Sequence, residues 1–509
     1  MALMTRSAAA LHYQPAAETA AAAACLSIFL FAILLPSTNA HTVVEQYHHV
    51  PLEGESFQLH TLHTTPIHTS TGSTTDPEEL GFRMKITHTD APSSPFSKQQ
   101  ASRAELHSRL VERDLARVDA IGKHIRTRSR HHASKATDPS AGPSLKDPVK
   151  SGLTSGTGEY FVTLQIGSPP KDVIATIDTG SDVFWLQCKP CQQCYQQIGP
   201  VFDPAASSSF TTLKCASPVC TQLQFFKCGK NSKNCLYAVA YGDGSVTVGD
   251  FAQDTLTLTS ISGRPYKIPQ FSFGCGHVNQ GLFVGSGGIL GLGRGKLSFP
   301  TQLSGKVSNR FSYCLTDRFV NPDANSHIFF GGTMSNGLQY TPLTQNPHLP
   351  AFYYVGLTGI TVGKNVITFP ASLYQLDSVG NGGVILDSGT SITRLMEPSY
   401  SIFRDSFRAA TSYLERVEGD SLFDTCYSIK GSATNIPPVN LLFQNKASLV
   451  LPANNVLLPI DSQGTYCLAF APSYVNISII GNVQQQNFRI EYDLANSRVG
   501  FGTADCATV

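Results

Sequence analysis

Two short stretches of the chain end an apolar strand on an aspartate beside a glycine and hydroxyl residues. "IDTGSD" spans residues 177–182 and "ILDSGT" spans residues 385–390, so Asp178 and Asp387 occupy matching positions. Two carboxylates that are brought close together cannot easily both ionise, and they share one proton. The ionised member can accept a proton from water while the other donates one to a reacting carbonyl. The pair is therefore a candidate for general acid–base chemistry.

A second pair of motifs follows the first, with "GILGLG" at residues 288–293 and "SIIGNV" at residues 478–483. An aspartate in a single Asp-x-Gly is more often a turn former, but turn chemistry does not predict these aliphatic–glycine echoes. The repeated order indicates an internal duplication. Glycine-rich, alternating stretches such as "YFVTLQIG" predict an all-β protein, with one clear helix in the second half at residues 398–415.

These motifs resemble those of the pepsin-like aspartic proteases, and within them the plant group typified by nepenthesin, from Glu159 to Cys506. The resemblance implies an all-β, bilobal fold with lobes at residues 159–340 and 350–509. It also implies a monomeric endopeptidase that works in acid and prefers bulky apolar residues. Asp178 and Asp387 would be the catalytic dyad, acting through water without a cofactor or metal. Polypeptides would be the substrates and pepstatin-type compounds the inhibitors.

The resemblance also assigns supporting roles around the dyad. In the family, the hydroxyls that follow the aspartates tie the two loops together, and those that follow the glycines hydrogen-bond the carboxylates. The first pair here is Thr179 and Ser388, and the second is Ser181 and Thr390. Gly180 and Gly389 would let the two backbones approach without a side-chain clash.

The stretch "YGDGSVTVGDF" at residues 241–251 resembles the family's flap, a hairpin that closes over the substrate. Tyr241 would be its characteristic tyrosine. Trp185, the only tryptophan of the chain, would donate its indole N–H to that tyrosine, because a buried tryptophan needs such a partner. The alternative is an ordinary core tryptophan and an ordinary strand tyrosine.

Cysteine usage indicates an exported protein. Of 13 cysteines, Cys25 lies in the leader, and the other twelve predict six disulfides. Seven lie in one cluster, so at least one bridge must leave it; Cys426 with Cys467 is the one pairing we predict. Zinc binding by the closely spaced cysteines is the disfavoured alternative. The cluster comprises Cys188, Cys191, Cys194, Cys215, Cys220, Cys228 and Cys235, and the others are Cys275, Cys314, Cys426, Cys467 and Cys506.

The first 150 residues are expected to be removed. Residues 1–40 contain an apolar block and the small-residue exit "STNA", as in a secretory signal; an uncleaved anchor is the alternative. Residues 41–150 predict a propeptide and linker of a zymogen, with helical spacing at Leu106, Leu110, Leu115 and Val118 but no sustained strand pattern. Eleven of the fifteen histidines lie between His41 and His132. Their protonation would loosen the propeptide by self-repulsion, unless they only reflect the composition of a solvated segment.

The composition of the chain also bears on which partners it binds and where it is located. Basic and acidic residues balance from Asp147 onward, which argues against nucleic-acid binding and against a DNA-binding chloroplast protease. The mature form is expected to be extracellular, in the cell wall, with no membrane association; the vacuole is the alternative. Asn476 begins the one glycosylation sequon, "NIS". A binding protein of the same fold, such as a plant xylanase inhibitor, is disfavoured because both aspartate motifs are complete.

Overall fold

The structure is a computed structural model that describes residues 81–97, 101–134 and 159–508. Short gaps lie within the last range, at residues 242–244, 282, 284, 318, 321–323, 333–336, 379, 421 and 431–434. The predicted signal peptide and most of the predicted linker lie outside the described residues. In the described part of the chain, no helix is both long and apolar enough to cross a membrane.

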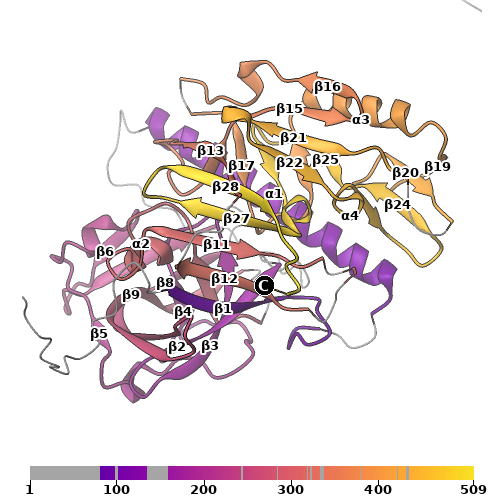
Figure 1. Cartoon of the computed structure of the whole chain (residues 1–509). Coiled ribbons are helices and arrows are strands. Elements are labelled where there is room, and N and C mark those ends of the chain that lie inside the picture. Colours follow the sequence, from indigo (N-terminus) through magenta and orange to yellow (C-terminus); the bar gives the residue numbers. More distant parts are fainter. Residues whose placement is uncertain are drawn as a thin grey trace, which may run out of the picture. The chain divides into compact units, whose positions relative to one another are not determined.

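Strands dominate the structure, as the all-β prediction requires, and Figure 1 shows them with the few helices. The helices are α1 (Arg103–Ser134), α2 (Phe299–Leu303), α3 (Ser399–Ala410), α4 (Ala453–Val456) and α5 (Asn482–Gln485), with 3-10 turns η1 (Pro204–Ala206), η2 (Cys220–Gln222), η3 (Ala371–Leu373) and η4 (Gln444–Lys446). The predicted helix of the second half is confirmed by α3, which begins one residue later and ends earlier than expected.

The strands of the first half are β1 (Gly81–His88), β2 (Tyr160–Ile166), β3 (Lys171–Asp178), β4 (Trp185–Gln187), β5 (Thr211–Thr212), β6 (Phe226–Cys228), β7 (Cys235–Ala240), β8 (Val246–Thr259), β9 (Pro265–Gln280), β10 (Gly288–Gly291), β11 (Arg310–Cys314) and β12 (Ser326–Gly331). Those of the second half are β13 (Gln339–Thr344), β14 (Tyr353–Val355), β15 (Leu357–Val362), β16 (Asn365–Thr368), β17 (Val384–Leu386), β18 (Thr393–Leu395), β19 (Glu415–Val417), β20 (Cys426–Ser428), β21 (Val439–Phe443), β22 (Ser448–Leu451), β23 (Leu457–Pro459), β24 (Thr465–Leu468), β25 (Phe470–Pro472), β26 (Ser478–Ile480), β27 (Phe488–Asp493) and β28 (Arg498–Thr503).

The duplicated motifs form duplicated strand pairs. β3 ends on Asp178 and runs parallel to β10, the "GILG" strand, with Asp178 opposite Gly291. In the second half β17 leads into Asp387 and runs parallel to β26, with Leu386 opposite Ile480. Each aspartate therefore lies where a central strand ends beside a second strand that supports it, and the aliphatic–glycine echo is the sequence of that second strand.

An antiparallel sheet joins the two halves of the chain. Its strands pair in the order β1–β12–β11–β27–β28–β13, and the pairing of β11 with β27 connects the halves. Across this pairing the rings of Phe311 and Tyr492 stack with centroids 4.6 Å apart. Beside them the buried hydroxyls of Tyr313 and Tyr492 are hydrogen-bonded at 2.9 Å. This buried contact fixes the two lobes, and therefore their two aspartates, relative to one another.

The expectation of no sustained strand in residues 41–150 is wrong for residues 81–88. β1 alternates buried Phe82, Met84 and Ile86 with more exposed positions, which is the period of a strand with one face in the core. It pairs with both β12 and β2. The segment is short and stands alone in a polar region, so the alternation was overlooked.

Candidate active site

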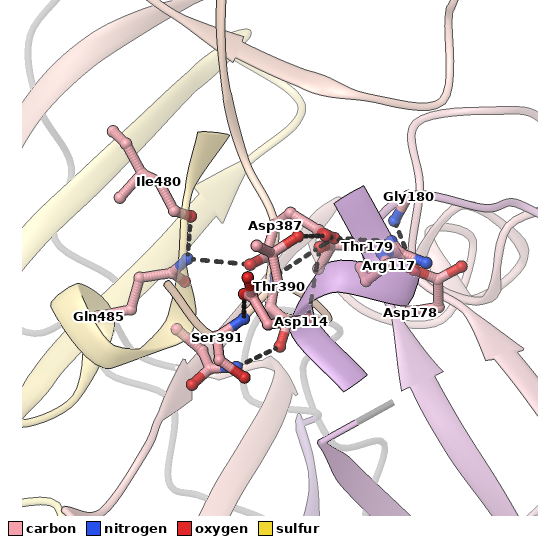
Figure 2. Close-up of polar contacts among 12 residues, drawn as sticks. Asp114, Arg117, Asp178, Thr179, Gly180, Asp387, Thr390, Ser391, Ile480 and Gln485 are labelled. Atoms are coloured by element: carbon pink, nitrogen blue, oxygen red, sulfur yellow. Dashed lines mark hydrogen bonds and ion pairs between the residues drawn. The ribbon is translucent and has the colours of Figure 1, made fainter. Parts of the chain in front are cut away.

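Asp178 and Asp387 meet at the floor of the site, and both are almost fully buried, at 4% and 1% exposure. The Gly180 backbone N–H donates to Asp178 Oδ1 at 3.0 Å. The Thr390 hydroxyl donates to Asp387 Oδ2 at 2.6 Å. Figure 2 shows the two carboxylates with their polar contacts. The structure thus brings together the two aspartates that the sequence singled out.

The hydroxyl residues beside the dyad tie one loop to the other. The Ser388 backbone N–H donates to Thr179 Oγ1 at 3.1 Å, and the two hydroxyl oxygens lie 3.4 Å apart. The hydroxyls that follow the two glycines were each expected to hydrogen-bond an aspartate, but only one of them does. Thr390 bonds Asp387, whereas the Ser181 hydroxyl makes no hydrogen bond to Asp178 among the described residues. The two carboxylates therefore have different surroundings.

Arg117, from the middle of α1, lies directly on the dyad (Figure 2). Its Nη2 is 2.7 Å from Asp178 Oδ1 and 2.8 Å from Asp387 Oδ1, and its Nε is 2.9 Å from Asp387 Oδ2. The Arg117 side chain is only 10% exposed. One guanidinium therefore binds both aspartates through three charge-assisted hydrogen bonds, which are the strong class of hydrogen bond.

The charge of Arg117 sets the protonation of the site. Burial by itself would raise the pKa of Asp387, but Arg117, the Thr390 hydroxyl and the Gly389 backbone N–H together lower it below its usual value. Burial would lower the pKa of Arg117, but the two carboxylates raise it. While α1 is in place, the ion pair is therefore held in its charged form.

The two glycines make room for this guanidinium. A Cβ at Gly180 would lie 2.6 Å from Arg117 Nη2, and a Cβ at Gly389 would lie 3.1 Å from Arg117 Cζ. The glycines were expected to let the backbones of the two loops approach one another. The atom nearest to each added Cβ belongs instead to the Arg117 side chain. The cavity left beside Arg117, Asp178 and Tyr241 is about 10 Å³, which is at most the space for one water molecule. No peptide can reach the dyad while α1 is bound.

The buried face of α1 is a stripe in which charged residues alternate with apolar ones. Leu110 packs against Ile392 and Phe423, while Val118 and Ile121 pack in a cluster with Phe352, Tyr354 and Ile479. In Figure 1 the violet helix α1 runs behind β27 and β28. Leu115, one of the four positions predicted to share a stripe, is 40% exposed instead. The true buried stripe includes Asp114 and Arg117, so the apolar spacing located the helix but not its face.

Histidines of the predicted propeptide contact acidic groups. His88 Nε2 lies 2.8 Å from Glu159 Oε2, and His107 Nε2 lies 2.7 Å from Asp420 Oδ2. These two histidines therefore lie beside carboxylates, and the predicted self-repulsion of the histidine-rich segment stays a prediction. The His124 ring packs against Phe352. The side chains of the remaining histidines between 41 and 132 lie outside the described residues.

The tryptophan and tyrosine of the predicted flap are in contact. The Trp185 indole N–H donates to the Tyr241 hydroxyl at 2.8 Å, and Trp185 is fully buried. The Phe283 ring packs on both, with centroids 4.8 Å from Trp185 and 5.6 Å from Tyr241. Burial raises the pKa of Tyr241 well above its ordinary value, so its hydroxyl stays protonated. Residues 242–244, within the predicted flap, lie outside the described residues.

The twelve cysteines from Cys188 to Cys506 are all disulfide-bonded, as the prediction of six bridges requires. Cys188 leaves the cluster to bond Cys275, while Cys426 bonds Cys467. The closely spaced Cys191 and Cys194 are bonded to one another, so they are not thiolate ligands in this structure. The remaining bridges are Cys215–Cys228, Cys220–Cys235 and Cys314–Cys506. The sequon residue Asn476 is exposed, just before β26.

Sequence reasoning missed Asp114 and Arg117. A signal was available, because both residues lie at helical spacing within a stripe that also holds Leu110, Val118 and Ile121. A charged residue on an apolar helix face is expected to have a partner on the surface that the helix covers. The partners, however, lie on distant parts of the chain, and nothing in the sequence pairs them.

Comparison with known proteins places the chain among plant proteases. Two family models match, "Xylanase inhibitor N-terminal" over residues 160–332 and "Xylanase inhibitor C-terminal" over residues 352–503. Aspartyl protease family protein 2 of Arabidopsis thaliana is 45% identical over 83% of this chain and 85% of its own length. Aspartic proteinase nepenthesin-1 of Nepenthes gracilis is 36% identical over 84% of this chain and 90% of its own.

Solved structures share the fold. The crystal structure of EDGP matches with a TM-score of 0.60 at 22% identity, covering 70% of this chain and 94% of that one. Basic 7S globulin from soybean matches with a TM-score of 0.55 at 23% identity, over 68% and 93% of the two chains. At this identity the likeness shows the fold alone.

Two β lobes that each contribute one aspartate to a shared site define the class of bilobal, pepsin-like aspartic proteases. The chain belongs to the plant aspartyl proteases of this class, the family that includes the nepenthesins. It is an aspartic endopeptidase, and its substrates are polypeptides.

Proposed function

We propose that this chain is the zymogen of a secreted, acid-acting endopeptidase whose catalytic dyad is Asp178 and Asp387. Residues 1–40 are its signal peptide, residues 41–150 its propeptide and linker, and residues 159–340 and 350–509 its two lobes. The observation that carries the proposal is the contact of Arg117 with both aspartates. A residue far from the two aspartates in sequence pairs with both of them and closes the site.

The geometry of that contact supports a water-based mechanism. A single nitrogen, Arg117 Nη2, lies within 2.8 Å of a carboxylate oxygen of each aspartate. A water molecule at that position could hydrogen-bond to both carboxylates. The ionised aspartate takes a proton from this water as its oxygen bonds to the peptide carbon, and the protonated aspartate donates its proton to the carbonyl oxygen. The tetrahedral product then breaks its C–N bond: the aspartate that took the proton from water gives it to the leaving nitrogen, and the other aspartate regains its proton from a hydroxyl of the tetrahedral product, which leaves a carboxylic acid.

Acid removes the block because carboxylates hold α1 in place. The lowered pKa of Asp387 shows that its charged form is stabilised by Arg117. This stabilisation is fully present above the pKa of the uncovered aspartate, and it is lost as the pH falls through the lowered value. Acid thus weakens the attachment of α1, after which the chain is cut in the linker that follows Ser134. The resemblance to the pepsin-like family supports a preference for bulky apolar residues in an extended substrate.

Acid treatment of purified full-length protein tests this proposal. We expect full-length protein at neutral pH to leave a denatured protein substrate intact, and acid to produce a shorter chain that begins between residues 135 and 159. The shorter chain should cleave the substrate, and pepstatin should stop it. Cleavage activity that appears without loss of the α1 segment, or that pepstatin does not reduce, would contradict the proposal.

A further inference from the structure

A carboxylate-binding pocket lies one helical turn from Arg117. It holds Asp114, which is fully buried. Asp114 Oδ1 accepts hydrogen bonds from the backbone N–H groups of Ser391, at 2.9 Å, and Ile392, at 2.8 Å. Its Oδ2 pairs with the guanidinium of Arg394. Figure 2 shows Asp114 reaching the Ser391 segment beside the dyad. Two backbone donors and one arginine therefore converge on one carboxylate.

Arg394 has more donors than Asp114 uses. Its side chain is 0% exposed, and its Nε and Nη1 have no hydrogen-bond partner among the described residues. The same holds for the Ser391 hydroxyl. A buried guanidinium is costly unless it is paired. In the described part of the chain the one carboxylate paired with Arg394 comes from α1, not from the lobe that carries Arg394. The lobe therefore holds an arginine whose counter-ion is supplied from outside it.

The pocket lies beside the path of the substrate. Ser391 and Ile392 directly follow Thr390, which hydrogen-bonds the catalytic Asp387. Asp114 precedes Arg117 by three residues, which corresponds to about 4.5 Å along a helix. An extended peptide advances about 3.3 Å per residue. Since Arg117 marks the position of the cleaved bond, the pocket matches a substrate residue one or two positions away from it.

We propose that Ser391, Ile392 and Arg394 form a substrate subsite for an acidic side chain, and that Asp114 fills this subsite in the zymogen. The inference rests on the proposed function, because α1 must leave before a substrate can enter. Charge-assisted hydrogen bonds from a guanidinium and backbone amides select an ionised carboxylate. The amide of glutamine has the same shape but cannot make the ion pair. The mature enzyme thus prefers peptides with Asp or Glu one or two residues from the cleaved bond.

Matched peptide pairs test the subsite. Each pair carries Glu or Gln at one position within two residues of a fixed cleavage site, and kcat/KM is measured with the acid-processed enzyme at about pH 5, where a Glu side chain is mostly ionised. We expect a Glu-to-Gln ratio of roughly ten to a hundred at one position. In Arg394→Met the ratio should fall to about one. Arg416→Met, an exposed arginine on β19, is the matched control and should keep the wild-type ratio.

The outcomes separate this inference from the proposed function. Pepstatin-sensitive cleavage of both peptides with a ratio near one at every position would refute the subsite while the endopeptidase stands, and Arg394 would then serve only to hold α1. No pepstatin-sensitive cleavage of either peptide would refute the proposed function. If Arg394→Met does not fold, Arg394→Lys keeps the charge but loses the planar fork. Its ratio should lie between one and the wild-type value, and an unchanged ratio would contradict the subsite.

Discussion

Arg117→Met should open the zymogen at a higher pH than the wild type. Methionine keeps the apolar stem that packs beside the dyad but removes all three hydrogen bonds to Asp178 and Asp387. Removing one partner of a buried ion pair destabilises the bound state by about 3–5 kcal/mol. This loss of stability applies only to the closed form. Once α1 has left, the two aspartates are hydrated or protonated and no longer need Arg117. The closed state of the variant should therefore be weaker wherever the aspartates are ionised.

The size of the pH shift follows from proton linkage. Each proton taken up on opening changes the free energy of opening by about 1.4 kcal/mol per pH unit. If opening protonates groups equivalent to two carboxylates, a loss of about 3–5 kcal/mol moves the midpoint upward by about one to two pH units. The shift is upward because the substitution weakens only the closed form, so less acid is needed to open the variant.

The assay is the initial rate of cleavage of a fluorogenic peptide by full-length protein, recorded at each pH before processing begins. Lys123→Met is the matched control, because Lys123 lies on the same helix but is half exposed and pairs with Asp119 of that helix. Its midpoint should equal that of the wild type. An Arg117→Met midpoint within about 0.3 pH units of both would refute the view that Arg117 holds the zymogen closed, since the linkage above requires a larger shift.

Three further outcomes follow from the structure. Tyr241→Phe leaves the buried Trp185 indole N–H without its acceptor, so kcat/KM should fall about ten- to a hundredfold; a loss as large as that of a dyad variant would contradict its role in orienting the flap. In mild acid, amides of α1 should exchange with deuterium before those of β1, because α1 is held by titrating carboxylates and β1 by buried Phe82 and Ile86; simultaneous exchange would mean that the two leave together. The Cys314–Cys506 bridge closes a loop of 192 residues and stabilises the folded state by up to about 5 kcal/mol. Its removal should lower the midpoint of thermal unfolding more than removal of the Cys191–Cys194 bridge, whose cysteines are three residues apart. A larger decrease on removal of Cys191–Cys194 would contradict this reasoning.

The fold class was predictable because each motif is short and the order of the two motifs is repeated. Each strand that leads into an aspartate has its supporting strand later in the same half of the sequence as an aliphatic–glycine motif, and the pairings β3–β10 and β17–β26 realise that order twice. The contact of Trp185 with Tyr241 was found through the family resemblance. Spacing alone does not bring together residues that are 56 positions apart.

The packing of α1 over the two aspartates was not predictable from the sequence. It depends on contacts between side chains that lie far apart in the sequence and share no motif. Arg117 lies 270 residues from Asp387, and Asp114 lies 280 residues from Arg394. A helical wheel predicts which residues share a face, but it cannot choose what that face covers. The apolar spacing therefore includes Leu115, which is exposed, and does not point to Asp114 or Arg117.

The most direct test of the central claim is the activity of Asp178→Asn and Asp387→Asn after acid treatment. To avoid dependence on self-processing, each chain is cut in its linker by an added protease before peptide cleavage is measured. We expect both variants to fold and to lose at least about a thousandfold in kcat, because each aspartate transfers a proton that an amide cannot. Asp172→Asn, an exposed position on the same strand as Asp178, should match the wild type. Activity within tenfold of the wild type in either dyad variant would contradict the claim that these two aspartates perform the hydrolysis.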